Sequence, residues 1–326
     1  MGNDKTRAAR YLRDHGYVML DVLPPDELVA YNRRVLEYLD TLPERVPGSD
    51  GLSVSGGFAC YGVASSFHNP VVRELRLRLD AVVRPVLRSL CGGERNIQSV
   101  VDRVMDRARG LCAGTESVHR DEAKGALKDD WIFGGALNLN LEGQQAFSLQ
   151  PDTHIFGANV AGGNFTVETD RDIKREFKAR RQLVEFGPGQ MILLFENIRH
   201  EVRGNKATCR QLRLFHGFRV TDSFEALYPE NVARMATQDI LVYKGGELPR
   251  MIPKLYPNLH WGPWQTFSGK NKWHPLLLND HTVGSGVHKG KRLSNVVRPF
   301  APSLRELGAM YEPYSPEELA LFVPSR

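Results

Sequence analysis

The stretch ESVHRDEAKGA contains two side chains that bind divalent metals, His119 and Asp121. They lie two positions apart, so on a β-strand both side chains point to the same face. A second histidine, His200, follows the apolar run MILLF and the short stretch ENIR. Two imidazoles and one carboxylate on one face can hold Fe(II) and leave positions open for a bidentate cosubstrate and oxygen. The spacing therefore predicts a metal site made of His119, Asp121 and His200.

Two arginines follow the second histidine at the start of the next apolar stretch. Arg210 comes ten residues after His200, and Arg213 is close behind. A guanidinium group can form two parallel hydrogen bonds with the far carboxylate of a dicarboxylate that chelates the metal. Because 210 and 213 differ by an odd number, only one of these side chains faces inward on a regular strand. We expect Arg210 to bind the cosubstrate, with Arg213 as the alternative.

The tripeptide H-R-D is also a signature of protein kinases, where its aspartate is the catalytic base. That signature requires an asparagine five residues after the aspartate to hold magnesium. Here Ala126 stands at that position, no D-F-G occurs, and no G-x-G-x-x-G precedes the motif. A kinase is excluded.

The elements that must position these residues change in type along the chain. Helical spacing predicts a helix over residues 4–14, one that begins after Pro24 and Pro25, and one that ends at Gly92 and Gly93. Residues 46–57 have the composition of a loop. From about residue 96 onward, short apolar runs are separated by Gly, Pro, Asp and Asn, which predicts strands. Helices followed by strands indicate an α+β fold, a β-sandwich or barrel with helices packed outside.

Three further segments carry a family resemblance. The segment LRDHGYVMLDVLPPDEL resembles a family opening, FSLQPDTHIFG resembles a turn usually written P-G-S-H, and FGPGQMILLFENIRHEVRGN resembles the block with the distal histidine. With the predicted ligands, the chain resembles the phytanoyl-CoA dioxygenase-like family of Fe(II)- and 2-oxoglutarate-dependent oxygenases over about residues 8–220. His15 and Gln190 stand where that family commonly has aspartate.

The resemblance implies a fold, an activity and a set of site residues. The fold is a double-stranded β-helix (jelly-roll or cupin-like) core with flanking N-terminal helices. The activity is oxidative decarboxylation of 2-oxoglutarate coupled to substrate hydroxylation. His119, Asp121 and His200 would hold Fe(II), and Arg210 would bind 2-oxoglutarate. Asn138 is a further candidate for contact with 2-oxoglutarate, and an internal hydrogen bond of the barrel is the alternative role for it.

Two other functions use the same fold. A cupin-like metalloprotein would bind a metal without 2-oxoglutarate and would not need Arg210. A non-catalytic jelly-roll protein with a structural or assembly role would keep only remnants of the site. Release of succinate separates the oxygenase from the cupin-like metalloprotein, and the intact set of three ligands argues against the non-catalytic protein.

The composition indicates the cellular compartment of the protein. Apolar residues make up 41% and charged residues 25% of the chain, which is typical of soluble proteins. A membrane span would need an apolar run of about eighteen residues, and the sequence has none. The cysteines form no C-x-x-C pair, which indicates reduced thiols and a cytoplasmic location. They are Cys60, Cys91, Cys112 and Cys209.

Positive charge is concentrated in the C-terminal third. Residues 244–298 hold nine basic and two acidic residues, a net +7, so the rest of the chain carries 5 − 7 = −2. We expect residues 1–220 to form the oxygenase domain and residues 221–326 to form a basic, Pro- and Gly-rich extension packed on it. The charge favours an anionic substrate, small or of acyl type. Three tryptophans among these lysines leave nucleic acid as a second candidate partner: Trp261, Trp264 and Trp273.

Overall fold

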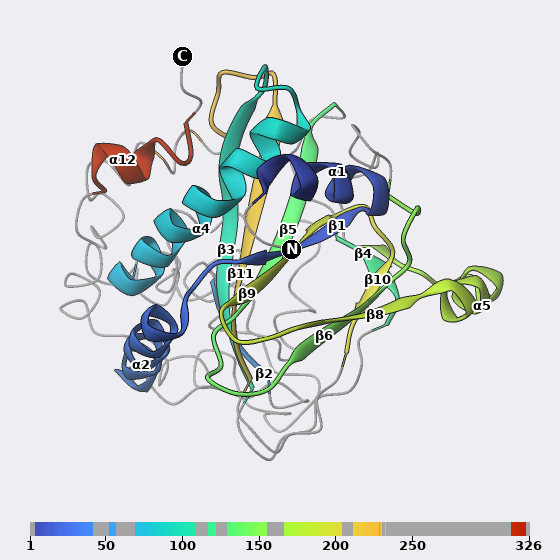
Figure 1. Cartoon of the computed structure of the whole chain (residues 1–326), viewed down its shortest axis with the longest axis horizontal. Helices are drawn as coiled ribbons and strands as arrows, with labels where there is room; N and C mark the ends of the chain where they lie inside the picture. The colour runs from blue at the N-terminus through green and yellow to red at the C-terminus, as the bar shows by residue number, and fades with distance from the viewer. Residues whose placement is uncertain are drawn as a thin grey trace, which may run out of the picture.

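The computed structural model describes residues 4–41, 52–56, 69–107, 117–121, 129–154, 166–203, 211–227, 229, 232 and 314–323. Figure 1 shows the N-terminal helices gathered on one side of a six-stranded sheet, with a smaller sheet beside it. This mixture of helices and antiparallel strands agrees with the predicted α+β class.

The three N-terminal helices form in the predicted segments, with ends within about two residues of the predicted ones. They are α1 (Lys5–His15), α2 (Pro25–Thr41) and α4 (Pro70–Leu90). Asn69 caps α4 by accepting a hydrogen bond from the amide of Val71, and Gly92 and Gly93 follow its end with positive φ angles of 72° and 79°. Backbone of this kind favours glycine, so the two glycines stop the helix.

The larger sheet has the strand order β1-β9-β5-β11-β3-β2, with antiparallel pairing between all neighbours. Its strands are β1 (Tyr17–Asp21), β2 (Leu52–Gly56), β3 (Asn96–Arg107), β5 (Trp131–Asn138), β9 (Gln190–Phe195) and β11 (Gln211–Thr221). Strands β3 and β11 pair along almost their whole length.

The smaller sheet has the order β7-β4-β10-β6-β8 and is also antiparallel. Its strands are β4 (His119–Arg120), β6 (Gln145–Leu149), β7 (Thr166–Val167), β8 (Gln182–Phe186) and β10 (His200–Val202). The chain passes from one sheet to the other between consecutive strands at three places: between β5 and β6, between β8 and β9, and between β10 and β11. Residues far apart in sequence are thereby brought together between the sheets.

Two apolar clusters follow from this arrangement. One joins α1, α2 and α4 to the helix-facing side of the larger sheet, with Leu12, Leu79 and Phe218 all fully buried. The other fills the space between the sheets, where Phe147 of β6 packs near Phe215 of β11. Alternation along β11 assigns even-numbered residues to the first cluster and Arg213 and Phe215 to the space between the sheets.

Two of the elements that the sequence did not predict have a clear physical reason. The predicted loop 46–57 includes the edge strand β2, whose register with β3 runs from Leu52 to Gly56; backbone pairing with a long neighbouring strand outweighs a Gly- and Ser-rich composition there. Helix α5 (Arg171–Arg180) was not predicted, because Phe177 is its one buried residue. Its sequence signal is Asp170, which caps the helix through the amides of Asp172 and Ile173.

The C-terminal end returns to the helical side of the molecule. The short helix α12 (Pro316–Leu319) lies beside α4 (Figure 1), where Glu318 forms two 2.6 Å hydrogen bonds with Arg73. The amide of Ser99 in β3 donates to the carbonyl of Leu321 at 2.7 Å. The basic segment 244–298 and its tryptophans lie outside the described residues. Among the described helices, none is both long and apolar enough to cross a membrane.

Candidate metal centre

Strands β4 and β10 bring the two predicted histidines together. Backbone pairing places His200 opposite His119, and their ring centroids are 4.2 Å apart. Asp121 follows β4 directly. The Nε2 atom of His119 lies 3.5 Å from Oδ1 of Asp121, and Nε2 of His200 lies 3.4 Å from Oδ2. One donor atom from each of the three residues lies within 4.8 Å of the other two, which makes this a group that could hold a metal ion.

Both imidazoles are held in the orientation that a metal requires. The Nδ1 atom of His119 is 2.6 Å from the carbonyl oxygen of Ser117, and Nδ1 of His200 is 3.0 Å from that of Ile198. A carbonyl oxygen only accepts, so each Nδ1 carries the proton and each Nε2 presents its lone pair. The same arrangement, a histidine bonded to the carbonyl two residues before it, fixes both rings and raises their basicity toward a metal.

The donor set is almost completely shielded from water. His119, Asp121 and His200 have relative exposures of 2%, 9% and 1%. The Phe147 ring lies 6.0 Å from that of His200, and Leu149 is paired with His200 across β6 and β10. Two imidazoles and one carboxylate in a buried site are ligands that non-haem iron prefers, so the residues present fit a divalent metal such as Fe(II).

Of the two arginines, Arg213 is the one that the structure describes. It is 3% exposed, and its guanidinium carbon lies 5.9 Å from the centre of the Phe147 ring. Since Phe147 also approaches His200, Arg213 lies on the metal-centre side of the larger sheet. Arg210, the preferred candidate from the spacing, lies outside the described residues.

The side-chain amide of Asn138 forms all its hydrogen bonds with other groups of the protein. Its Nδ2 donates to the carbonyls of Gly143 and Phe186, and its Oδ1 accepts from the amide of Asn140 and from Nε2 of Gln145. These four bonds exhaust the capacity of an amide. The arrangement agrees with the internal hydrogen-bonding role that the sequence left open.

Asn140 and Gln145 extend this amide network to the first residues of β11. Oδ1 of Asn140 accepts from the Leu212 amide at 2.7 Å, and Nε2 of Gln145 donates to the Leu212 carbonyl at 3.0 Å. The network therefore anchors the backbone next to Arg213. Sequence reasoning did not identify Gln145, because its partner lies in a distant strand.

Two further histidines that the structure describes, His154 and His216, make structural contacts. His154 Nε2 bonds to the carbonyl of Arg13 at 2.8 Å, and its ring packs so closely on Gly16 that any side chain there would collide with it. His216 is fully buried, with Nε2 3.2 Å from Oγ of Ser99. Burial lowers its pKa below the ordinary value and so disfavours the protonated imidazole.

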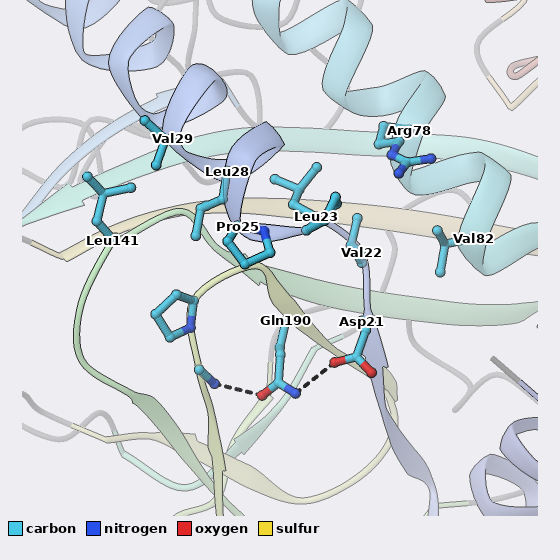
Figure 2. A pocket seen from close by; sticks show the side chains of 13 residues that line it. Asp21, Val22, Leu23, Pro25, Leu28, Val29, Arg78, Val82, Leu141 and Gln190 are labelled. Atoms are coloured by element: carbon cyan, nitrogen blue, oxygen red, sulfur yellow. Dashed lines mark hydrogen bonds between the residues drawn. The ribbon is translucent and has the colours of Figure 1, made fainter. Parts of the chain in front are cut away.

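A separate cavity lies away from the candidate ligands. Figure 2 shows it where β1 meets α2 and the β8–β9 turn; its volume is about 800 Å³, and its lining is largely apolar. Gln190 holds the turn at its edge by accepting from the Gly187 amide and donating to Asp21. An aspartate, as in the family pattern, has no donor for the second bond. None of the three candidate ligands lines this cavity.

Comparison with protein-family models and with curated proteins finds no match for this chain. Solved structures give distant similarities. EctD from S. alaskensis with 2-oxoglutarate and 5-hydroxyectoine is 18% identical, with 67% of this chain and 78% of EctD covered and a TM-score of 0.49. SnoK, a non-heme alpha ketoglutarate dependent carbocyclase from nogalamycin biosynthesis, is 16% identical, with 68% and 86% covered and a TM-score of 0.49. A Pseudomonas putida prolyl-4-hydroxylase is 16% identical, with 66% and 98% covered and a TM-score of 0.41. These TM-scores are all below 0.5, so we infer function from the geometry of the candidate metal centre.

Proposed function

We propose that this protein is an Fe(II)- and 2-oxoglutarate-dependent oxygenase with a double-stranded β-helix core. One observation carries the proposal: two imidazole Nε2 atoms and one carboxylate converge in a buried site, and backbone carbonyls fix both imidazoles for metal binding. Two histidines and one carboxylate with open positions are typical of non-haem Fe(II) oxygenases. The solved structures with distant similarity include proteins described with iron and 2-oxoglutarate.

The residues have distinct roles in this proposal. His119, Asp121 and His200 would hold Fe(II), which supplies oxygen activation coupled to decarboxylation of 2-oxoglutarate and oxidation of a substrate C–H bond. The low exposure of the three ligands limits the contact of the site with bulk water. A low local dielectric constant also strengthens charge interactions with a bound dicarboxylate.

We assign binding of the far carboxylate of 2-oxoglutarate to Arg213 rather than to Arg210. Its inward direction, its 3% exposure and its position over Phe147 support this choice. The bond between Asn140 and the Leu212 amide keeps the backbone beside it in place. A planar guanidinium at such a site can form two parallel hydrogen bonds with a carboxylate.

Within this superfamily, the quoted segments favour the phytanoyl-CoA dioxygenase-like branch, and hydroxylation is the proposed outcome. The +7 charge of residues 244–298 favours an anionic substrate. The proposed domain division stays at residue 220, with the extension bordering the site.

Anaerobic titration of the protein with Fe(II) and then 2-oxoglutarate tests the proposal. A weak visible charge-transfer band is expected, because 2-oxoglutarate would chelate the metal through two atoms. The Asp121→Ala protein should lose both iron binding and succinate formation, whereas the exposed carboxylate of Glu142 provides a matched control in Glu142→Ala.

The possible results separate the alternatives. A metal-bound protein that forms no band and no succinate would indicate the cupin-like function. A protein that binds no metal would indicate a non-catalytic role. Full turnover by Asp121→Ala would refute the ligand assignment.

A further inference from the structure

We infer that Glu168, together with Arg120 and Arg199, forms a clamp behind the candidate metal centre that sets the separation of its two histidines. These three residues are called the back-face clamp below. The inference rests on the proposed function, because it concerns how the chain prepares the same metal site.

The two arginines are sequence neighbours of the candidate ligands. Arg120 lies between His119 and Asp121, and Arg199 immediately precedes His200. Successive side chains on a strand point to opposite faces. Both guanidinium groups therefore lie on the face of the smaller sheet that is turned away from the ligand atoms.

Glu168 joins these arginines across three neighbouring strands. It follows β7, and its amide donates to the carbonyl of Val118 at 2.9 Å. Its Oε1 atom lies 3.3 Å from Nε of Arg199 and 3.7 Å from Nε of Arg120. Since the strand order is β7-β4-β10, one carboxylate connects the strand of His119 with the strand of His200.

Arg120 also holds the turns on either side of the site. Its Nη1 donates to the carbonyl of Thr153 at 3.0 Å and to the carbonyl of Asn197, in the turn before His200. The hydroxyl of Thr153 in turn accepts from the amide of Arg199 at 3.0 Å. Arg120 and Arg199 are thus linked through the backbone as well as through Glu168.

Backbone pairing alone aligns β4 only weakly with β10. Strand β4 is two residues long, and its register with β10 consists of the pair His200 and His119. The side chains of the clamp are 14–18% exposed, so solvent screens their charges only in part. Without the carboxylate the two guanidinium groups would repel each other, and the strands that carry the imidazoles would lose their common anchor.

Co(II) titration of the full chain, followed by its d–d absorption, measures the effect on the metal site itself. Loss of a contact that orients a ligand typically weakens metal binding about 10- to 100-fold, and we expect this for Glu168→Gln. The matched control is Glu185→Gln, which removes an exposed carboxylate from β8 of the same sheet. Arg199→Gln breaks the same contact from its other end, together with the 3.6 Å contact between Arg199 and Glu176. It should weaken binding at least as much as Glu168→Gln, and the double variant should be no weaker than the weaker single one.

Glu168→Asp separates position from charge. It keeps the negative charge but shortens the reach toward both arginines, so we expect weakened binding and an altered Co(II) spectrum. Full affinity in Glu168→Asp would mean that charge alone matters, and equal affinity in Glu168→Gln and Glu185→Gln would mean that the clamp does not act on the site. Either result overturns the inference.

Urea unfolding of the metal-free variants separates positioning from folding. We expect Glu168→Gln to unfold at a lower urea concentration than Glu185→Gln, because it removes a mostly buried carboxylate that two guanidinium groups share, but to remain fully folded in the absence of urea. A metal-free Glu168→Gln protein that is already partly unfolded without urea would make the role structural and would overturn the inference. A wild-type protein that binds no Co(II) would refute the proposed function itself, whereas normal wild-type binding with an unaffected Glu168→Gln variant refutes the clamp alone.

Discussion

Replacement of Asp102 by asparagine should remove a large part of the stability of the fold. Nε of Arg76 on α4 donates to Oδ2 of Asp102 on β3 at 2.6 Å, and the two side chains are 1% and 0% exposed. Burial alone would lower the pKa of Arg76, but the carboxylate raises it above its ordinary value. The asparagine has nearly the same volume, so the change removes the charge without opening a cavity.

The expected cost follows from leaving a buried cation without its counter-ion. Removing one partner of a buried pair typically costs about 3–5 kcal/mol, against a total stability of about 5–15 kcal/mol for a folded domain. The pair of Arg34 on α2 and Glu74 on α4 provides a comparison, because its shortest contact is also 2.6 Å but its side chains are 38% and 47% exposed. Glu74→Gln should therefore cost no more than about 1 kcal/mol.

Urea unfolding of the metal-free protein, followed by circular dichroism, measures both changes. Asp102→Asn should lower the free energy of unfolding several-fold more than Glu74→Gln does. A double replacement of Arg76 and Asp102 by apolar residues should recover most of the loss, since no charge then remains buried. Equal, small losses in Asp102→Asn and Glu74→Gln would refute the reasoning that burial, rather than distance, sets the cost.

Three further predictions concern the site, the pH dependence and the basic segment. Arg213→Lys should raise the 2-oxoglutarate concentration needed for turnover about 10- to 100-fold with the metal still bound, because an ammonium cannot reproduce the paired hydrogen bonds. Arg210→Ala should have little effect on this concentration. The opposite result for the two variants would transfer the role to Arg210. Burial lowers the pKa of His216 below 6.5, so the unfolded chain binds more protons and stability falls as the pH drops below about 6.5. His216→Gln should flatten this fall in urea unfolding of metal-free protein between about pH 7.5 and pH 5.5; an unchanged slope would contradict it. Neutralising five basic residues should weaken retention of the protein on a polyanion column, because charge attraction acts over roughly 8 Å at physiological salt. Succinate formation without substrate should stay unchanged. Retention that survives would show that residues 244–298 do not attract anions. The five are Lys270, Lys272, Lys289, Lys291 and Arg292.

The sequence by itself determined the helices whose ends are marked by capping residues and the three residues whose side chains can bind a metal. Asn69 before α4 and Gly92 after it mark a helix through caps that need no distant partner. The order of His119, Asp121 and His200 was readable because a two-residue spacing places side chains on one strand face. The tertiary structure brings these three residues together as their spacing predicts.

Only the tertiary structure decided which neighbours these residues meet. The inward direction of Arg213 depends on the register of β11 with β5, in which it lies opposite Asn138. Glu168 is an ordinary acidic residue in sequence, and its contact with Arg120 and Arg199 exists because β7, β4 and β10 are adjacent. Local patterns report the period and the ends of an element, whereas strand order and register arise from packing between residues far apart in the chain.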